Sequence, residues 1–232
     1  GQGMDLAEAV KQSCNVYFYN LILEYQEKKL DAINILSMYA NKLGFNQKTG
    51  IDLPYEDKGR VPDIKWMNKQ KSGSKNWSKR GHMPILVIGQ GETLVTPIQV
   101  ANFMNLISTR GKTFKPRLVK DEKPIPVKSK IKKYVWDELQ RWMYSVVNDK
   151  KGTAYMLHDL NDRGAKIYGK TGTAERSKEI DRYNVWFAGY LELDGKLMSL
   201  VVMIEDVSSD DKKVAKEISK DIFDYYITTK GN

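Results

Sequence analysis

Apolar side chains recur at helical spacing through much of the first two thirds of the chain, which predicts helices there rather than strands. Asp5, with Glu8 three residues later, is typical of a helix start. Thr96 followed by Pro97 indicates another start, because the missing N–H of proline is harmless in the first turn. In one helix we expect Ile33 and Tyr39 to face inward. One expected helix begins at Asp5. The others cover about residues 16–25, 30–43, 96–109 and 134–148.

Two stretches in the first two thirds of the chain show no clear periodicity of apolar residues. Residues 46–92 contain Pro54, Pro62 and Pro84 among several glycines, so we expect a mostly irregular region with short elements. Residues 114–132 are expected to be extended, and the segment from Lys151 to open a further short helical turn.

The last third changes to alternating patterns that predict strands over about 165–174, 184–193 and 196–206. Asp194-Gly195 lies between the last two and is typical of a tight hairpin turn. A final amphipathic helix is expected over about 214–226. The fold class is therefore α+β with an antiparallel sheet, divided into a mainly helical part (1–160) and a part of strands and a closing helix (161–232).

Composition limits the class of protein. The 232 residues are 41% hydrophobic, enough for a packed core, and their formal net charge is +9. The densest basic stretch, 65–80, is either a surface for anions or a solvated surface of a lysine-rich chain; the second interpretation is preferred. No nucleic-acid motif accompanies the charge, so no nucleic-acid partner is expected.

Cys14 is the single cysteine, and a small buried side chain is a simpler interpretation than a ligand. We expect no metal site and no cofactor. No stretch is apolar enough to span a membrane, and residues 1–15 do not resemble a signal peptide. Because the sequence begins close to a motif of chemical interest, we expect it to be part of a longer protein.

Two motifs carry candidate chemistry. Ser13-Cys14-Asn15 lies between two predicted helices; its simplest alternative interpretation is a helix N-cap. The second motif is residues 169–174 (GKTGTA), in which a lysine and hydroxyls between glycines on a strand can meet a carboxylate. One alternative is an exposed edge strand whose lysine discourages pairing with another chain. A phosphate loop is another, since Gly164 has the required spacing, but such a loop opens a helix rather than continuing a strand.

S-x-N and K-T-G are two of three signatures of serine penicillin-recognising enzymes, and the third is a helical Ser-x-x-Lys. That third pattern does not precede Ser13. It occurs later, at Ser72, Ser129 and Ser209, in contexts that do not predict a nucleophile stacked one helical turn from its lysine.

The ordered succession of motifs resembles the class B penicillin-binding proteins, and most closely the elongation-type group called penicillin-binding protein 2. The segments that carry the resemblance are residues 12–19 (QSCNVYFY), 49–54 (TGIDLP), 88–91 (IGQG), 96–102 (TPIQVAN), 152–154 (GTA), 169–174 (GKTGTA) and 186–190 (WFAGY).

The resemblance implies a penicillin-binding-protein/serine β-lactamase-like transpeptidase fold, here incomplete, whose nucleophile helix and first strands lie upstream. It implies a D,D-transpeptidase that transfers acyl groups between peptidoglycan stem peptides and binds β-lactam antibiotics. The expected partners include proteins of the cell-wall elongation complex. The expected location is the outer face of the cytoplasmic membrane, with the anchor outside this sequence. This chain alone is expected to be inactive.

The resemblance also implies roles for residues. Ser13, Asn15 and Lys170 are expected to be catalytic: Ser13 relays a proton, Asn15 orients the substrate amide, and Lys170 supplies positive potential. Thr171 and Thr173 are expected to bind the substrate carboxylate. Thr173 N–H is expected to be half of the oxyanion hole, and Gly172 to leave room for the ligand.

Two rival interpretations remain open on the sequence. A serine β-lactamase would need a water-activating glutamate before K-T-G, and Glu122 and Glu138 lie in that stretch without a recognisable setting. A non-enzymatic scaffold in a cell-wall complex, or a polyanion-binding module, would use the positive charge instead, and its binding would weaken steeply with salt.

Overall fold

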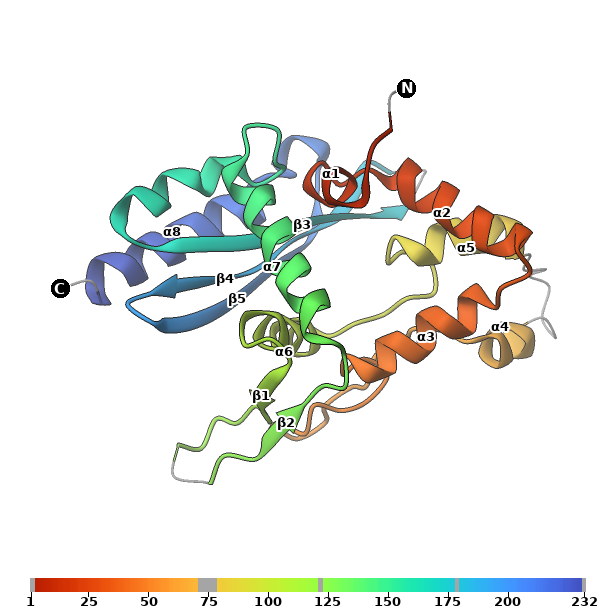
Figure 1. Cartoon of the computed structure of the whole chain (residues 1–232), viewed down its shortest axis with the longest axis horizontal. Coiled ribbons are helices and arrows are strands. Elements are labelled where there is room, and N and C mark those ends of the chain that lie inside the picture. Colours follow the sequence, from red (N-terminus) through yellow and green to blue (C-terminus); the bar gives the residue numbers. More distant parts are fainter. Residues whose placement is uncertain (1–2, 71–78, 121–122, 178–179, 231–232) are drawn as a thin grey trace.

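A three-stranded antiparallel sheet forms the centre of the second half of the chain (Figure 1). The structure is a computed structural model that describes residues 3–70, 79–120, 123–177 and 180–230. The strands of this sheet, in the order β3-β4-β5, are β3 (Lys166–Ser177), β4 (Arg182–Leu193) and β5 (Lys196–Val207). Asp194 and Gly195, which join β4 to β5, have φ values of 49° and 72°, as a tight hairpin turn requires.

The central strand β4 is buried on both faces because helices cover both sides of the sheet. On one face, Val185, Phe187 and Leu191 pack with the 3₁₀ helix η1 (Tyr155–Arg163) and with α8 (Val214–Lys230). The ring of Phe187 meets that of Phe223 edge-on at 6.1 Å between centroids. The alternation of side chains along a strand places Ala188 and Tyr190 on the opposite face. There they pack with α6 (Pro97–Ser108) and α7 (Lys133–Asn148).

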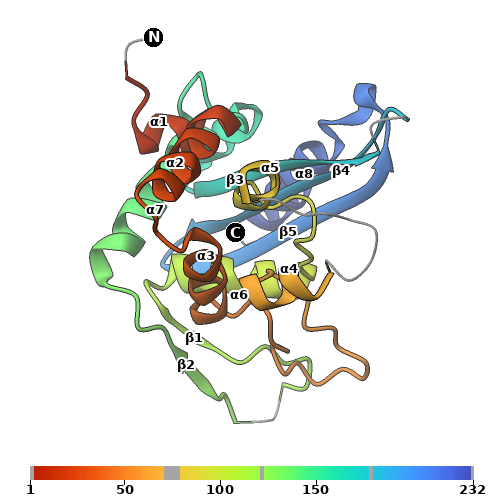
Figure 2. The same cartoon turned by 90° about the vertical axis from the view of Figure 1, so that its right-hand side faces the viewer.

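The first part of the chain is helical and has a core of its own, formed by Ile22, Ile33, Met67, Met83 and Leu86. Figures 1 and 2 show its helices grouped beside one end of the sheet, with α5 close to β3. These helices are α1 (Leu6–Lys11), α2 (Asn15–Glu27), α3 (Ala32–Lys42), α4 (Ile64–Gln70) and α5 (Lys79–Val87). Two small elements complete the fold: a hairpin of β1 (Lys112–Phe114) and β2 (Pro126–Lys128), and a 3₁₀ turn η2 (Ser209–Asp211).

Most of the predicted elements are confirmed within a few residues, and their local causes are visible. Asp5 accepts a hydrogen bond from Glu8 N at the start of α1. Thr96 and Gln99 form a reciprocal capping box at the start of α6.

Two expectations need correction. Tyr39 does not face inward: it is 45% exposed, because the residues that α3 buries are Ala32, Ile33, Ser37 and Ala40. The described part of the region 46–92 is mostly irregular with two short helices, as expected, but α5 continues through Pro84, at which an interruption was expected, even though proline removes one backbone hydrogen bond there.

Two further observations concern the surface. No helix in the described parts of the chain has the length and apolar character needed to cross a bilayer. Among the described residues, β5 pairs with β4 alone, so its second edge is unpaired.

Candidate active site

A cavity of about 780 Å³ lies where the first helices, the segment after α5, strand β3 and the start of α8 meet. It brings together residues from the two parts of the chain, including all six residues singled out from the sequence. Those six are Ser13, Asn15, Lys170, Thr171, Gly172 and Thr173.

Ser13 and Asn15 occupy the junction between α1 and α2. Ser13 has a φ of 54°, which is uncommon for a non-glycine residue, and such conformations cluster at functional sites. The N-cap of α2 is Cys14, and its side chain makes no capping bond. The interpretation of this motif as a helix cap by Ser13 or Asn15 is therefore wrong, and both side chains are exposed at the cavity.

Lys170 connects the two motifs directly. Its Nζ donates to Ser13 Oγ at 2.8 Å, across 157 residues of sequence, and to the carbonyl oxygen of Thr171 at 2.8 Å. Because Lys170 is only a donor, it occupies a lone pair of the Ser13 hydroxyl and leaves the Ser13 proton available to another group. Burial disfavours the ammonium form and lowers the pKa of Lys170 to about 8.

Thr171 contacts Thr153, a cavity residue outside the two motifs. Its Oγ1 lies 2.7 Å from Oγ1 of Thr153, and Lys216 Nζ donates to the Thr153 carbonyl at 3.2 Å. The preceding Gly152 lets the chain pack closely against the end of α7, since a Cβ at that position would lie 2.2 Å from the Val146 carbonyl oxygen.

Strand β3 presents a free backbone edge to the cavity. Gln90 Nε2 donates to the carbonyl of Thr173 at 3.4 Å, and Lys170 donates to that of Thr171, two residues earlier. In an antiparallel ladder the N–H and C=O of one residue point to the same side. The N–H of Thr173 therefore also faces this edge.

The alternative interpretations of the second motif can now be judged. Gly164 ends η1 with a φ of 81°, and residues 169–171 continue strand β3 without opening a helix, so the phosphate-loop interpretation is wrong. The described residues contain no group of three or more His, Cys, Asp or Glu able to hold a metal ion. Of the two glutamates weighed for a β-lactamase, Glu122 lies outside the described residues and Glu138 pairs with Arg141 on α7.

Of the later Ser-x-x-Lys matches, the two that fall within the described residues show no hydrogen bond between their serine and their lysine. Ser72 lies outside the described residues, and Ser129 Oγ accepts from the backbone of Ile131. Ser209 lines the cavity, but its Oγ donates to Asp181, and the Lys212 ammonium lies 3.5 Å from the centroid of the Tyr183 ring.

In a longer chain that includes the native upstream sequence, we therefore expect Ser209→Ala to leave the rate of acylation by β-lactams unchanged within about twofold, because the Ser209 hydroxyl is bound to Asp181 and not to a lysine. Intact mass spectrometry after incubation with a β-lactam measures the rate. Loss of the adduct in Ser209→Ala, with the fold retained by circular dichroism, would show that Ser209 is the nucleophile.

Comparison with known protein families agrees with this geometry. Residues 1–224 match the penicillin binding protein transpeptidase domain. The chain belongs to this family. Its fold is the α+β fold of these transpeptidase domains, with which it shares the antiparallel sheet and its flanking helices.

Relatives and solved structures point to one group within the penicillin-binding proteins. The chain is 28% identical over 247 residues to peptidoglycan D,D-transpeptidase MrdA of Haemophilus influenzae, covering 96% of this chain and 36% of that protein. It is similar to penicillin-binding protein PBP2 in its complex with MreC from Helicobacter pylori, with a TM-score of 0.77, 30% identity and coverage of 96% and 40%. Pseudomonas aeruginosa PBP2 in complex with WCK 5153 gives a TM-score of 0.76, 28% identity and coverage of 95% and 47%.

The chain thus spans about a third of the length of the curated relatives that it matches. Sequence reasoning found the residues of the two motifs but assigned no role to Gln90, Thr153 or Lys216. Gln90 and Thr153 lie in segments that carried the resemblance, so a signal existed for them. Lys216 lies in a lysine-rich helix start where nothing in the sequence distinguishes it from its neighbours.

Proposed function

We propose that this chain forms the substrate-recognition side of a peptidoglycan D,D-transpeptidase site that β-lactams acylate. The observation that carries the proposal is the hydrogen bond from Lys170 Nζ to Ser13 Oγ, at 2.8 Å, within a cavity that also exposes Asn15 and the free edge of β3. A peptide can lie along such an edge as an additional strand. Lysine and threonine hydroxyls beside it suit a peptide that ends in a carboxylate.

Each of the site residues has its own role in the proposed reaction. Lys170 attracts the substrate carboxylate, and Thr171 and Thr173 donate hydrogen bonds to it. Ser13, whose lone pair is occupied by Lys170, passes its proton between the base that activates the nucleophile and the leaving amine. Asn15 orients the substrate amide, Gly172 leaves room for the peptide, and the N–H of Thr173 stabilises the oxyanion.

The nucleophile in this proposal is a Ser-x-x-Lys that precedes residue 1 in the longer protein. Two observations support it: Ser129 and Ser209 are not paired with their lysines, and the relatives are more than twice as long as this chain. By itself the chain is then catalytically incomplete. As in the complex of PBP2 with MreC, the parent protein would work with cell-wall elongation proteins, on the outer face of the membrane that anchors it.

The test compares this chain with a longer chain that includes the native upstream sequence, by intact mass after incubation with a β-lactam. We expect a covalent adduct on the longer chain alone, because acylation requires the activated serine. An adduct on the present chain would contradict the placement of the nucleophile. Absence of an adduct on both folded proteins would favour a non-enzymatic scaffold.

A further inference from the structure

The cavity contains a second lysine, Lys216, that the proposed roles do not use. It lies in the first turns of α8, lines the cavity and is half-buried. Its neighbours Lys213 and Lys220 pair with Glu217 and Asp159, whereas the described residues place no carboxylate within ion-pair distance of Lys216 Nζ. Burial lowers the pKa of Lys216, because loss of solvation disfavours its charged form.

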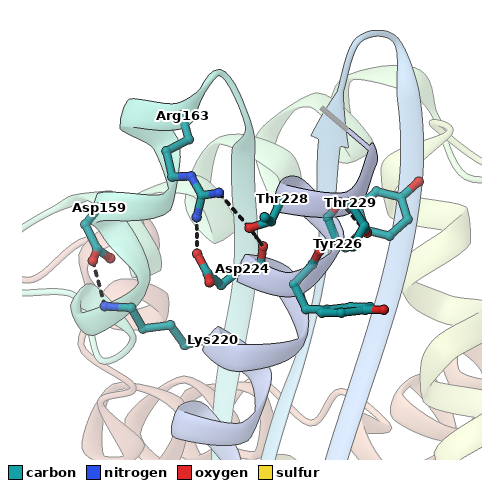
Figure 3. A network of polar contacts seen from close by, with 8 residues as sticks. Asp159, Arg163, Lys220, Asp224, Tyr226, Thr228 and Thr229 are labelled. Carbon is teal, nitrogen blue, oxygen red and sulfur yellow. Dashed lines mark hydrogen bonds and ion pairs between the residues drawn. The ribbon is translucent and has the colours of Figure 1, made fainter. Parts of the chain in front are cut away.

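The backbone of Lys216 is held in place by the packing of α8. Ala215 beside it is 1% exposed, and Ser219 is fully buried. Figure 3 shows that α8 is also fastened to η1, through the ion pair of Lys220 with Asp159 and through Arg163, which contacts Asp224 and Thr228. Lys216 therefore faces Thr153 from a well-anchored backbone.

The contact with Thr153 places Lys216 next to the hydroxyls that the ligand needs. A hydroxyl has one proton, so if Thr171 donates to Thr153 it has none for a ligand carboxylate. When Thr153 donates to Thr171 instead, Thr171 is free to donate into the cavity, and such chains strengthen each member. A ligand carboxylate at Thr171 favours this second arrangement, because it accepts the Thr171 proton. The Lys216 ammonium beside Thr153 in turn favours binding of that carboxylate.

We propose that Lys216 is a specificity-determining residue of this site: by holding Thr153 and adding positive charge to the cavity, it selects ligands with a free carboxylate next to the scissile bond. The inference rests on the proposed function and deepens it. Lys170 and Lys216 then act on the same carboxylate from two sides of Thr171.

The test measures discrimination rather than activity alone. In the longer chain, second-order acylation rates are measured for a penicillin with its free carboxylate and for its methyl ester. We expect Lys216→Met to lower the rate for the acid by about five- to tenfold, as removal of one partly screened charge implies, and to leave the ester nearly unchanged. Lys216→Arg should restore most of the preference for the acid.

Lys220→Met is the matched control, because Lys220 is one turn further along α8 and binds Asp159 outside the cavity. We expect it to keep the wild-type acid-to-ester ratio, because Arg163 still links α8 to η1 through Asp224 and Thr228. An unchanged ratio in Lys216→Met would overturn the proposal. An equal fall in the acylation rates of the acid and of the ester would also overturn it, since that result would indicate a merely structural role of Lys216.

A binding experiment on the present chain separates this inference from the proposed function. N-acetyl-D-alanyl-D-alanine and its C-terminal amide are titrated into wild type and Lys216→Met, and affinities are read from NMR shifts. A wild-type preference for the acid that disappears in Lys216→Met supports the inference even if no adduct forms on the longer chain. Equal wild-type affinity for acid and amide would overturn it.

Discussion

Replacing Lys170 by methionine in the longer chain is expected to lower the rate of β-lactam acylation by about 100- to 10,000-fold, the range that a positioned proton-transfer network contributes. The substitution removes the charge and both hydrogen bonds of Nζ, to Ser13 Oγ and to the Thr171 carbonyl. Methionine keeps most of the length and apolar contact of the lysine stem, so the fold should be retained. Stopped-flow measurement with a fluorescent β-lactam gives the rate.

The control for this prediction is Lys166→Met, on the same strand but exposed and outside the cavity lining, which should acylate at the wild-type rate. The pH dependence supplies a second control. Lys170 is charged below its pKa of about 8 and neutral above it, so the wild-type rate should fall as pH rises through that value. Lys170→Met should lack this fall. A normal rate in Lys170→Met would contradict the assignment.

Replacing Gly169 by alanine is expected to lower the free energy of unfolding by about 1–3 kcal/mol, as overpacking of a filled core does. A Cβ at Gly169 would lie 2.4 Å from Cζ of Phe187, far inside van der Waals contact. The Phe187 ring is fully buried against Phe223 and has little room to retreat. Urea denaturation followed by circular dichroism measures the change.

Two variants test the cause of that loss. Gly172→Ala places its Cβ 3.3 Å from Cβ of Trp186, so it should cost much less stability while narrowing the cavity. Combining Gly169→Ala with Phe187→Leu should cost less than the sum of the two single changes, because the shorter side chain removes the clash. Additive losses would show that Phe187 is not the obstacle.

These two glycines illustrate how far the sequence predicts the site. The G-K-T-G spacing indicated a strand that a ligand approaches, and β3 confirms the strand. The spacing alone did not distinguish Gly169, required by the Phe187 ring behind it, from Gly172, which lies at the cavity and to which only the family resemblance assigned room for the ligand. Both glycines look alike in the sequence, because the difference depends on which side chains the adjacent strand β4 places against them.

Failures of local prediction have a similar cause. Tyr39 fits the apolar period of α3, yet packing buries the neighbouring face of that helix, and Tyr39 remains exposed. Pro84 is typical of a helix break, yet α5 continues through it, packed against α2 with Met83 and Leu86 in the core. Tertiary packing outweighs a local preference of a few kcal/mol in such cases.

The features that could be predicted from the sequence are local in origin: the elements with clear periods and caps, the Asp194-Gly195 turn, and the ordered motifs that indicated the family. These depend on backbone preferences and on residues close together in the chain. The hydrogen bond of Lys170 to Ser13, the contact of Thr153 with Thr171, and the position of Lys216 at the same cavity became visible in the folded chain. Those contacts join segments that are distant in the sequence, and the packing of helices against the sheet, which no local preference specifies, brings them together.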